Sequence, residues 1–256
     1  MMPARPIRVG ALLRTAGAAS DPTLRQAVRD AEAMGADVIF GSDDLPPRYA
    51  DCAGFDAGTT PAAWGELTTR AEIGLLISAM GYRSPDLLAD RARTVDHTSG
   101  GRLILGFSAG GNGNDGYGND GYASSGDGFR ALVDGLASIE YSLARHSPPP
   151  QRDIPILITG PGDRKTLPLI AGFADIWHSP GPVDEFRRQN GLLHAYVEAA
   201  QRDNASIERA VWWRGPSEAD RYRNEGATLF TAEVTPHENG YDSTNLGELI
   251  AWRDGL

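Results

Sequence analysis

Short apolar runs alternate with longer amphipathic stretches along the chain, and this alternation sets the first expectation for the fold. A run that is apolar at nearly every position is typical of a strand buried on both faces. Apolar positions spaced three or four apart are typical of a helix with one buried face. The predicted strands cover residues 7–13, 38–40, 72–80, 103–107, 156–158, 175–178, 210–213 and 228–230. The predicted helices cover residues 21–34, 61–67, 84–97, 129–144, 164–173, 183–202, 217–225 and 246–252.

Every predicted strand is followed by a predicted helix, so the strands must run parallel, because each crossover returns the chain to the same end of the sheet. The chain has 256 residues, and a closed (β/α)8 barrel typically needs about 250. An open doubly wound sheet is the competing arrangement, but consecutive βα units without a domain break favour the closed barrel. We therefore expect an α/β protein that forms one TIM-barrel domain over residues 1–256.

Three stretches lack either period and are expected to be loops, at residues 45–60, 108–127 and 147–153. The second contains a tandem repeat, in which Gly-Asn-Asp-Gly-Tyr at residues 113–117 recurs at once at residues 118–122. Five residues are too few for a solenoid unit. Two interpretations stay open, a duplicated flexible loop or a mobile lid over a site.

Composition narrows the classes of partner. The formal net charge of −10 and the pI of about 4.9 disfavour nucleic acids, because an acidic surface repels phosphodiester backbones. Cys52 is the only cysteine, which excludes an intramolecular disulfide and a zinc-type cysteine pattern. Residues 1–9 lack the apolar core of a secretion signal, and no apolar run approaches the roughly 20 residues that span a bilayer. We expect a cytoplasmic protein without a membrane partner that acts on a small molecule.

In such a barrel the active site lies where the strands end. The segments that follow strands are residues 41–44, 78–83, 108–112, 159–166 and 177–178. The segment at 159–166 is the most suggestive, because a strand, a glycine turn and a helix N-terminus present backbone N–H groups to a phosphate. Arg164, Lys165 and Thr166 would add charge and a hydroxyl to such a site, and an ordinary turn is the alternative.

Three titratable residues at strand ends are the catalytic candidates: Asp43, Asp44 and His178. Successive residues on a strand point to opposite faces, so only one of the two aspartates need face the pocket, and a metal site is not expected. His178 suits acid–base chemistry near neutral pH, and a packed imidazole is the alternative. Ser108 lacks the context of a nucleophile elbow, which disfavours serine hydrolase chemistry.

An ordered set of motifs resembles the luciferase-like monooxygenase superfamily. It comprises Thr-Arg-Ala-Glu-Ile-Gly at residues 69–74, Tyr-Arg-Ser-Pro at 82–85 and Ser-Gly-Gly-Arg-Leu-Ile-Leu-Gly at 99–106. Further matches are Pro-Ile-Leu-Ile at 155–158, Gly160, Gly162, Arg-Lys-Thr-Leu at 164–167 and Ala-Asp-Ile-Trp at 174–177. The resemblance covers about residues 5 to 180, and beyond that point only the barrel pattern continues.

The resemblance implies a bound deazaflavin coenzyme F420 or flavin mononucleotide (FMN). It implies that Asp43 lies near the ring and that a bulge at Ser78 and Ala79 backs it. It also implies that the turn after the fifth strand binds the cofactor phosphate, through Thr159, Gly160, Pro161 and Gly162. It also implies a pocket lining at the end of the fourth strand, formed by Gly110, Gly111 and Asn112.

The expected function is therefore an F420-dependent oxidoreductase that moves a hydride to or from a small organic substrate. One alternative is an FMN-dependent monooxygenase, which would act with oxygen or a flavin reductase partner. Another is a cofactor-binding barrel without turnover, because Asp44 and Gly111 stand where many relatives have histidine and tryptophan. Barrels of this family commonly pair, so a homodimer is also expected.

Overall fold

The computed structural model describes residues 5–15, 21–42, 58–77, 84–108 and 126–256. The strands are β1 (Arg8–Leu13), β2 (Val38–Ser42), β3 (Glu72–Ile77), β4 (Leu103–Ser108), β5 (Ile156–Thr159), β6 (Ile176–Ser179), β7 (Glu208–Trp212), β8 (Leu229–His237) and β9 (Gly240–Asp242). The helices are α1 (Asp21–Met34), α2 (Thr60–Leu67), α3 (Pro85–Ser99), α4 (Gly126–Arg145), α5 (Thr166–Phe173), α6 (Val183–Ala199), α7 (Pro216–Asn224) and α8 (Thr244–Asp254).

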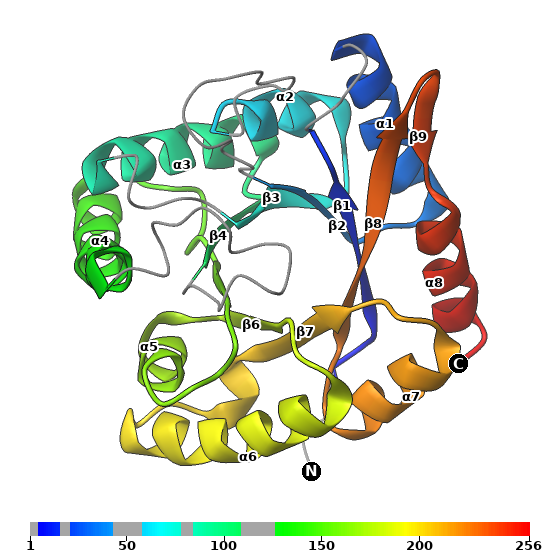
Figure 1. The fold of residues 1–256 in the computed structure, drawn as a ribbon. Coiled ribbons are helices and arrows are strands. Elements are labelled where there is room, and N and C mark those ends of the chain that lie inside the picture. The colour runs from blue at the N-terminus through cyan, green and yellow to red at the C-terminus, as the bar shows by residue number, and fades with distance from the viewer. Residues whose placement is uncertain (1–4, 16–20, 43–57, 78–83, 109–125) are drawn as a thin grey trace.

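The strands β1 to β8 close into a parallel barrel. Each strand pairs with the next one along the chain, and β8 pairs with β1 from Arg8 opposite Leu229 to Leu13 opposite Val234. The helices form an outer ring around the strands (Figure 1). The predicted TIM barrel is confirmed, and the open doubly wound sheet is excluded because a closed sheet has no free edge between β1 and β8.

The helices bury one face each against the outer side of the barrel. In α1 the buried residues are Leu24, Ala27, Val28 and Ala31, which recur at the helical spacing. The prediction placed the start of the fifth helix at residue 164, but α5 begins at Thr166. Pro168 therefore falls in the first turn, where a backbone N–H would have no partner inside the helix, and it does not disrupt α5. Within the described ranges, no helix is both long and apolar enough to cross a bilayer.

One element was missed by the sequence interpretation. The eighth strand was expected to end at residue 230, whereas β8 continues to His237 and turns through two residues into the antiparallel β9. Figure 1 shows this hairpin rising beside α1. The phenol of Tyr241 anchors it by donating a 3.1 Å hydrogen bond to the carbonyl of Arg14, at the end of β1.

The strand register arranges the inside of the barrel in layers. Inward residues alternate along each strand, and closing a tilted sheet shifts the level by one residue from strand to strand, so residues of alternate strands share a layer. Following the printed pairs around the barrel gives one layer of Val38, Ile104, Ile176 and Leu229. These four belong to one apolar cluster inside the barrel, separate from the cluster beneath the helices. The layer above it has little side-chain volume, from Gly10, Gly74, Leu157 and Ala210.

The layer at the N-terminal end is ionic. Arg8 donates to Glu208 at 2.7 Å and also pairs with Glu72, while Arg152 reaches Glu72 at 2.6 Å. The seventh strand was predicted to begin at residue 210, but β7 also includes Glu208 and Arg209, and both are buried. Charged residues can occupy these positions because each one has a partner, so this end of the barrel is sealed by ion pairs.

We predict that Arg8→Met lowers the free energy of unfolding by about 3 kcal/mol, because it leaves the buried carboxylate of Glu208 without its main partner. Urea denaturation measures the change. The matched control is Arg188→Met, which breaks an exposed pair with Glu185 on α6 and should cost less than about 1 kcal/mol. Equal losses in the two variants would contradict the account of the ionic layer.

Candidate active site

The upper half of the barrel interior is more polar than the lower apolar layers. The register places Phe40, Gly106, His178 and Thr231 in one layer, and Leu12, Leu76, Thr159 and Trp212 in the next layer toward the C-terminal mouth. His178 and Thr231 are fully buried, and Thr159 is nearly so. The polar side chains thus gather on the β5–β8 side of the mouth, where catalytic groups of a TIM barrel are expected.

Hydrogen bonds between β5 and β6 determine which nitrogen of His178 carries the proton. The Thr159 hydroxyl donates to the backbone carbonyl of His178 at 3.1 Å, because a carbonyl only accepts. That hydroxyl has one hydrogen, so toward the imidazole Nδ1 at 3.4 Å it acts as an acceptor. Nδ1 therefore holds the proton, and Nε2 presents a lone pair.

His178 is held neutral. Burial lowers the pKa of His178 to about 3, because the imidazolium form would lose its hydration. Its Nε2 has no hydrogen-bond partner in the described part of the chain, and its ring meets Trp212 edge-on at 4.6 Å between centroids. Near neutral pH such a group can accept a hydrogen bond, but it is a weak proton acceptor. The prediction that His178 is catalytic stays a prediction, with the role narrowed to hydrogen bonding.

The sequence predicted that the N-terminus of α5 would offer free backbone N–H groups, but several of these groups have partners within the protein. The Asp163 carboxylate accepts from the backbone N–H groups of Lys165 and Thr166 at 2.9 Å each, and the Thr166 hydroxyl accepts from the N–H of Asp163. This reciprocal pair is a capping box. Gly160 donates its N–H to the carbonyl of His178 at 3.2 Å. Four N–H groups of the turn are therefore already used within the protein.

Two backbone N–H groups and two cationic side chains of this turn are without partners among the described residues. Among the described residues, the N–H groups of Gly162 and Arg164 have no hydrogen-bond partner, and the exposed side chains of Arg164 and Lys165 have no ion-pair partner. These groups suit a phosphate, although not at the helix axis, where the Asp163 carboxylate would repel an anion. The predicted phosphate-binding turn of Thr159, Gly160, Pro161 and Gly162 stays a prediction with this changed set of donors.

Gly162 has a structural reason to be glycine. Its φ is +62°, and a Cβ there would lie 2.9 Å from the indole of Trp177 and 3.1 Å from Gln189. The left-handed backbone and the close packing each exclude a larger residue. The Trp177 indole in turn donates to the carbonyl of Gly160 at 3.2 Å, so the turn is held from below by a buried side chain.

Seven predicted site residues lie outside the described residues, namely Asp43, Asp44, Ser78, Ala79, Gly110, Gly111 and Asn112. The strands that precede them, β2, β3 and β4, end at the same mouth as β5 and β6. Their roles stay predictions. Within the described ranges, no three residues of the types His, Cys, Asp and Glu come together as metal ligands.

Three interior residues at the mouth were missed by the sequence interpretation: Trp212, Thr231 and Glu233. Trp212 lies opposite Thr231 in the β7–β8 register, and Glu233 follows Thr231 on the same face of β8. Two signals could have identified them. Asn-Gly at residues 239–240 indicates a hairpin, and Leu, Thr and Glu at 229, 231 and 233 alternate with apolar residues at 230, 232 and 234.

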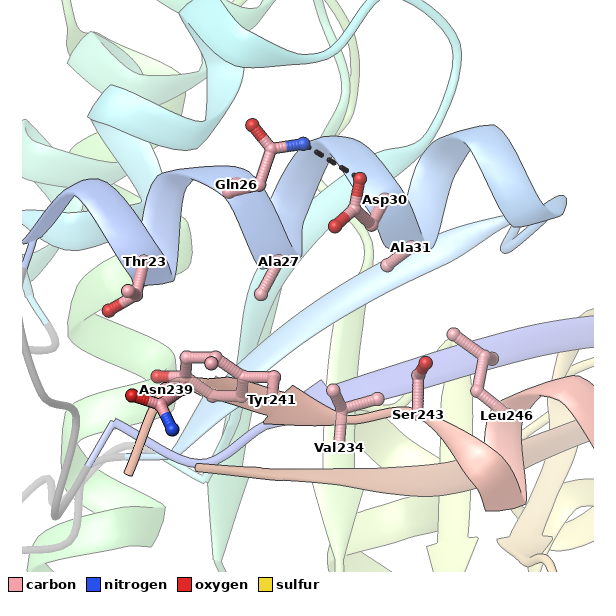
Figure 2. Close-up of a pocket in the computed structure, with 11 residues that line it drawn as sticks. Thr23, Gln26, Ala27, Asp30, Ala31, Val234, Asn239, Tyr241, Ser243 and Leu246 are labelled. Carbon is pink, nitrogen blue, oxygen red and sulfur yellow. Dashed lines mark hydrogen bonds between the residues drawn. The ribbon is translucent and has the colours of Figure 1, made fainter. Parts of the chain in front are cut away.

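A separate pocket of about 190 Å³ lies between α1 and the β8–β9 hairpin. Figure 2 shows Ala27 and Asp30 on α1, across the pocket from Val234 and Leu246. Val234 belongs to the outer apolar cluster, so the pocket is on the outer side of β8, away from the barrel interior. Burial raises the pKa of Tyr241, another lining residue, to about 12, which keeps its phenol a neutral donor.

Comparisons with known proteins identify one family and several relatives that the chain resembles. The family model of luciferase-like monooxygenases matches residues 6–215. A curated protein of Mycobacterium tuberculosis, named as a coenzyme F420-dependent oxidoreductase, is 34% identical over 105 residues. That alignment covers 41% of this chain and spans 28% of the relative's length.

Two solved structures share the fold. An F420-dependent secondary alcohol dehydrogenase, in complex with an F420–acetone adduct, aligns with a TM-score of 0.77 at 14% identity, over 96% of this chain and 98% of the other. The oxygenating constituent of a Pseudomonas putida diketocamphane monooxygenase, in complex with FMN, aligns with a TM-score of 0.62 at 14% identity. The second alignment covers 81% of this chain and 67% of that protein. At these identities the likeness establishes the fold alone.

The buried imidazole gives a pH prediction. Because folding lowers the pKa of His178 from about 6.5 to about 3, the unfolded state binds a proton between these values and the folded state does not. Its contribution to stability is therefore complete above pH 6.5 and is lost as the pH falls. We expect His178 to lower the free energy of unfolding by about 2 kcal/mol as the pH falls from 6.5 to 5.

Urea denaturation of the wild type and of His178→Gln at several pH values measures the contribution of His178 to this pH dependence. The variant should lose less stability over that interval than the wild type. His237→Gln, at an exposed position on the hairpin, serves as the control and should follow the wild type. Parallel curves for the wild type and His178→Gln would show that the imidazole is charged or solvated.

Proposed function

Because the chain belongs to the luciferase-like monooxygenase family, we propose that it is an oxidoreductase that uses coenzyme F420 to move a hydride to or from a small organic substrate. The alignment with the F420-dependent relative supports this cofactor. The observation that carries the proposal is the β5–α5 turn, which leaves free amides and two cations beside the polar mouth.

The residues of the turn fit a phosphate-bearing cofactor. The amides of Gly162 and Arg164, with the side chains of Arg164 and Lys165, would hold the phosphate. Charge-assisted hydrogen bonds of this kind are about twice as strong as neutral ones. The remaining predicted contacts are Asp43, Ser78, Ala79, Gly110, Gly111, Asn112, Thr159, Gly160 and Pro161.

The chain's own residues would orient the reactants and exclude water. F420, when bound, supplies a two-electron hydride carrier, so the protein needs positioning groups more than reactive ones. His178 offers a neutral acceptor at Nε2, held in orientation by Thr159 and by the Trp212 ring. Trp212 and Leu12 give the mouth an apolar wall on the β7–β1 side.

FMN-dependent oxygenation is the second candidate. The family name and the FMN-bound structural neighbour favour it. In that case a separate reductase would supply reduced flavin. Product formation that requires oxygen supports this candidate, and turnover of the reduced cofactor without oxygen supports the F420 enzyme. Tight binding of a cofactor without turnover would instead support a cofactor-binding barrel.

Fluorescence titrations of the purified protein with F420 and with FMN test the cofactor. We expect micromolar binding of F420 and weaker binding of FMN. The dephosphorylated deazaflavin chromophore should bind about tenfold more weakly than F420, because it lacks the group that the turn would hold. Binding of neither cofactor would overturn the proposed function.

A charge-removal variant tests the turn itself. Arg164→Ala combined with Lys165→Ala should weaken F420 binding about tenfold or more, because two unpaired cations beside the phosphate are lost. The control, Arg187→Ala combined with Arg188→Ala, removes the same charge from the neighbouring helix α6 and should leave the affinity unchanged. Equal weakening by both pairs would show that only the overall charge matters.

A further inference from the structure

Glu233 lies inside the barrel at its C-terminal mouth. Along β8, Phe230, Ala232 and Val234 pack in the outer cluster, while Leu229 packs inside the barrel. Since side chains alternate along a strand, Thr231 and Glu233 face inward with Leu229. Glu233 pairs with Leu12 of β1 and is half-buried. Its side chain therefore lies nearer the mouth than the layer of Leu12 and Trp212, two residues along β8 from Thr231.

No residue in the described part of the chain pairs with Glu233. Neither a hydrogen bond nor an ion pair reaches its carboxylate, although other inward carboxylates, such as Glu72 and Glu208, are paired with arginines. Its oxygens are not among the buried polar atoms of the described residues, so the carboxylate stays in contact with solvent at the mouth. An inward carboxylate that the chain leaves unpaired is expected where the chain binds or reacts with something else.

Two polar groups near Glu233 also lack hydrogen-bond partners within the described residues. The Thr231 hydroxyl, two residues earlier, is fully buried and has no partner within the described residues. His178 Nε2 lies in the same layer and is likewise unpartnered. Trp212 lies across from Thr231 and contacts the His178 ring. His178 and Thr231 thus lie beside the Trp212 indole, and Glu233 follows Thr231 on the same face of β8.

We propose that Glu233 is the residue that exchanges a proton with the oxygen of the substrate, which is seated against Trp212 and hydrogen-bonded by Thr231. This inference rests on the proposed function. In the oxidising direction, the substrate carbon loses a hydride to oxidised deazaflavin, and the hydroxyl on that carbon loses its proton to the Glu233 carboxylate. The products are a carbonyl compound, the reduced cofactor and a protonated Glu233, which then releases its proton to water.

His178 does not fit the proton-exchange role. Its burial keeps it neutral, with a pKa of about 3, so it would hold a substrate proton poorly near neutral pH. A half-buried carboxylate at the mouth can receive a proton and pass it to solvent. The two residues therefore have different roles: His178 accepts a hydrogen bond, and Glu233 accepts the proton.

The test compares Glu233→Gln with Glu238→Gln, a matched change on the exposed hairpin turn. F420 affinity is measured first by fluorescence, and turnover is then followed with primary and secondary alcohols and their carbonyl counterparts. Glu233→Gln should keep F420 affinity within about twofold and lower kcat by about a hundredfold or more. Glu238→Gln should match the wild type.

Thr231→Val adds a readout that does not depend on activity. The substitution removes an unpartnered buried hydroxyl at nearly constant volume, so Tm should rise. KM should increase about tenfold with a smaller change in kcat, because a hydrogen bond to the substrate is lost. A fall in Tm would show that the hydroxyl has a structural role, and would overturn its place in the subsite.

The outcomes separate this inference from the proposed function. Absence of F420 binding by the wild type would overturn the proposed function, and this inference with it. Intact F420 binding, with wild-type kcat in Glu233→Gln, would overturn only the role of Glu233. Intact binding without turnover of any alcohol or carbonyl would overturn the assignment of a substrate oxygen.

Discussion

The parallel register of the closed barrel is the constraint on which the candidate site depends. Each strand is displaced by one residue relative to its neighbour, so every second residue of alternate strands meets in one layer. That geometry places ion pairs at the N-terminal end, apolar side chains in the middle and polar side chains at the mouth. The position of a residue in the register therefore decides whether it is sealed, packed or available to a ligand.

Partnering of polar groups separates structural from candidate functional residues. At the sealed end, Glu208 is buried but is held by Arg8. Toward the mouth, His178 Nε2 and the Thr231 hydroxyl are buried without partners, and Glu233 is half-buried without one. An unpartnered buried polar group typically costs stability, on the order of 1 to 3 kcal/mol. His178 Nε2 and the Thr231 hydroxyl both lie toward the mouth, where the proposed substrate would complete their hydrogen bonds.

Much of the fold followed from the sequence, because buried parallel strands and amphipathic helices leave distinct periodicities. The site followed less completely, since its character depends on contacts between distant segments. The glycine turn at 159–162 was identified, but the capping role of Asp163 depends on side-chain geometry that spacing alone does not define. Glu233 was missed because the eighth strand was ended too early, and its lack of a partner could be seen only in three dimensions.

The proposed cofactor site depends on the β5–α5 turn, which would hold a phosphate beside the polar mouth. The most direct measurement is a crystal structure of the protein soaked with F420. We expect phosphate density within hydrogen-bonding distance of the Gly162 and Arg164 amides, and we expect the deazaflavin ring of F420 at the mouth near Trp212. Density for F420 in the pocket between α1 and the hairpin, or with its phosphate away from the turn, would contradict the account.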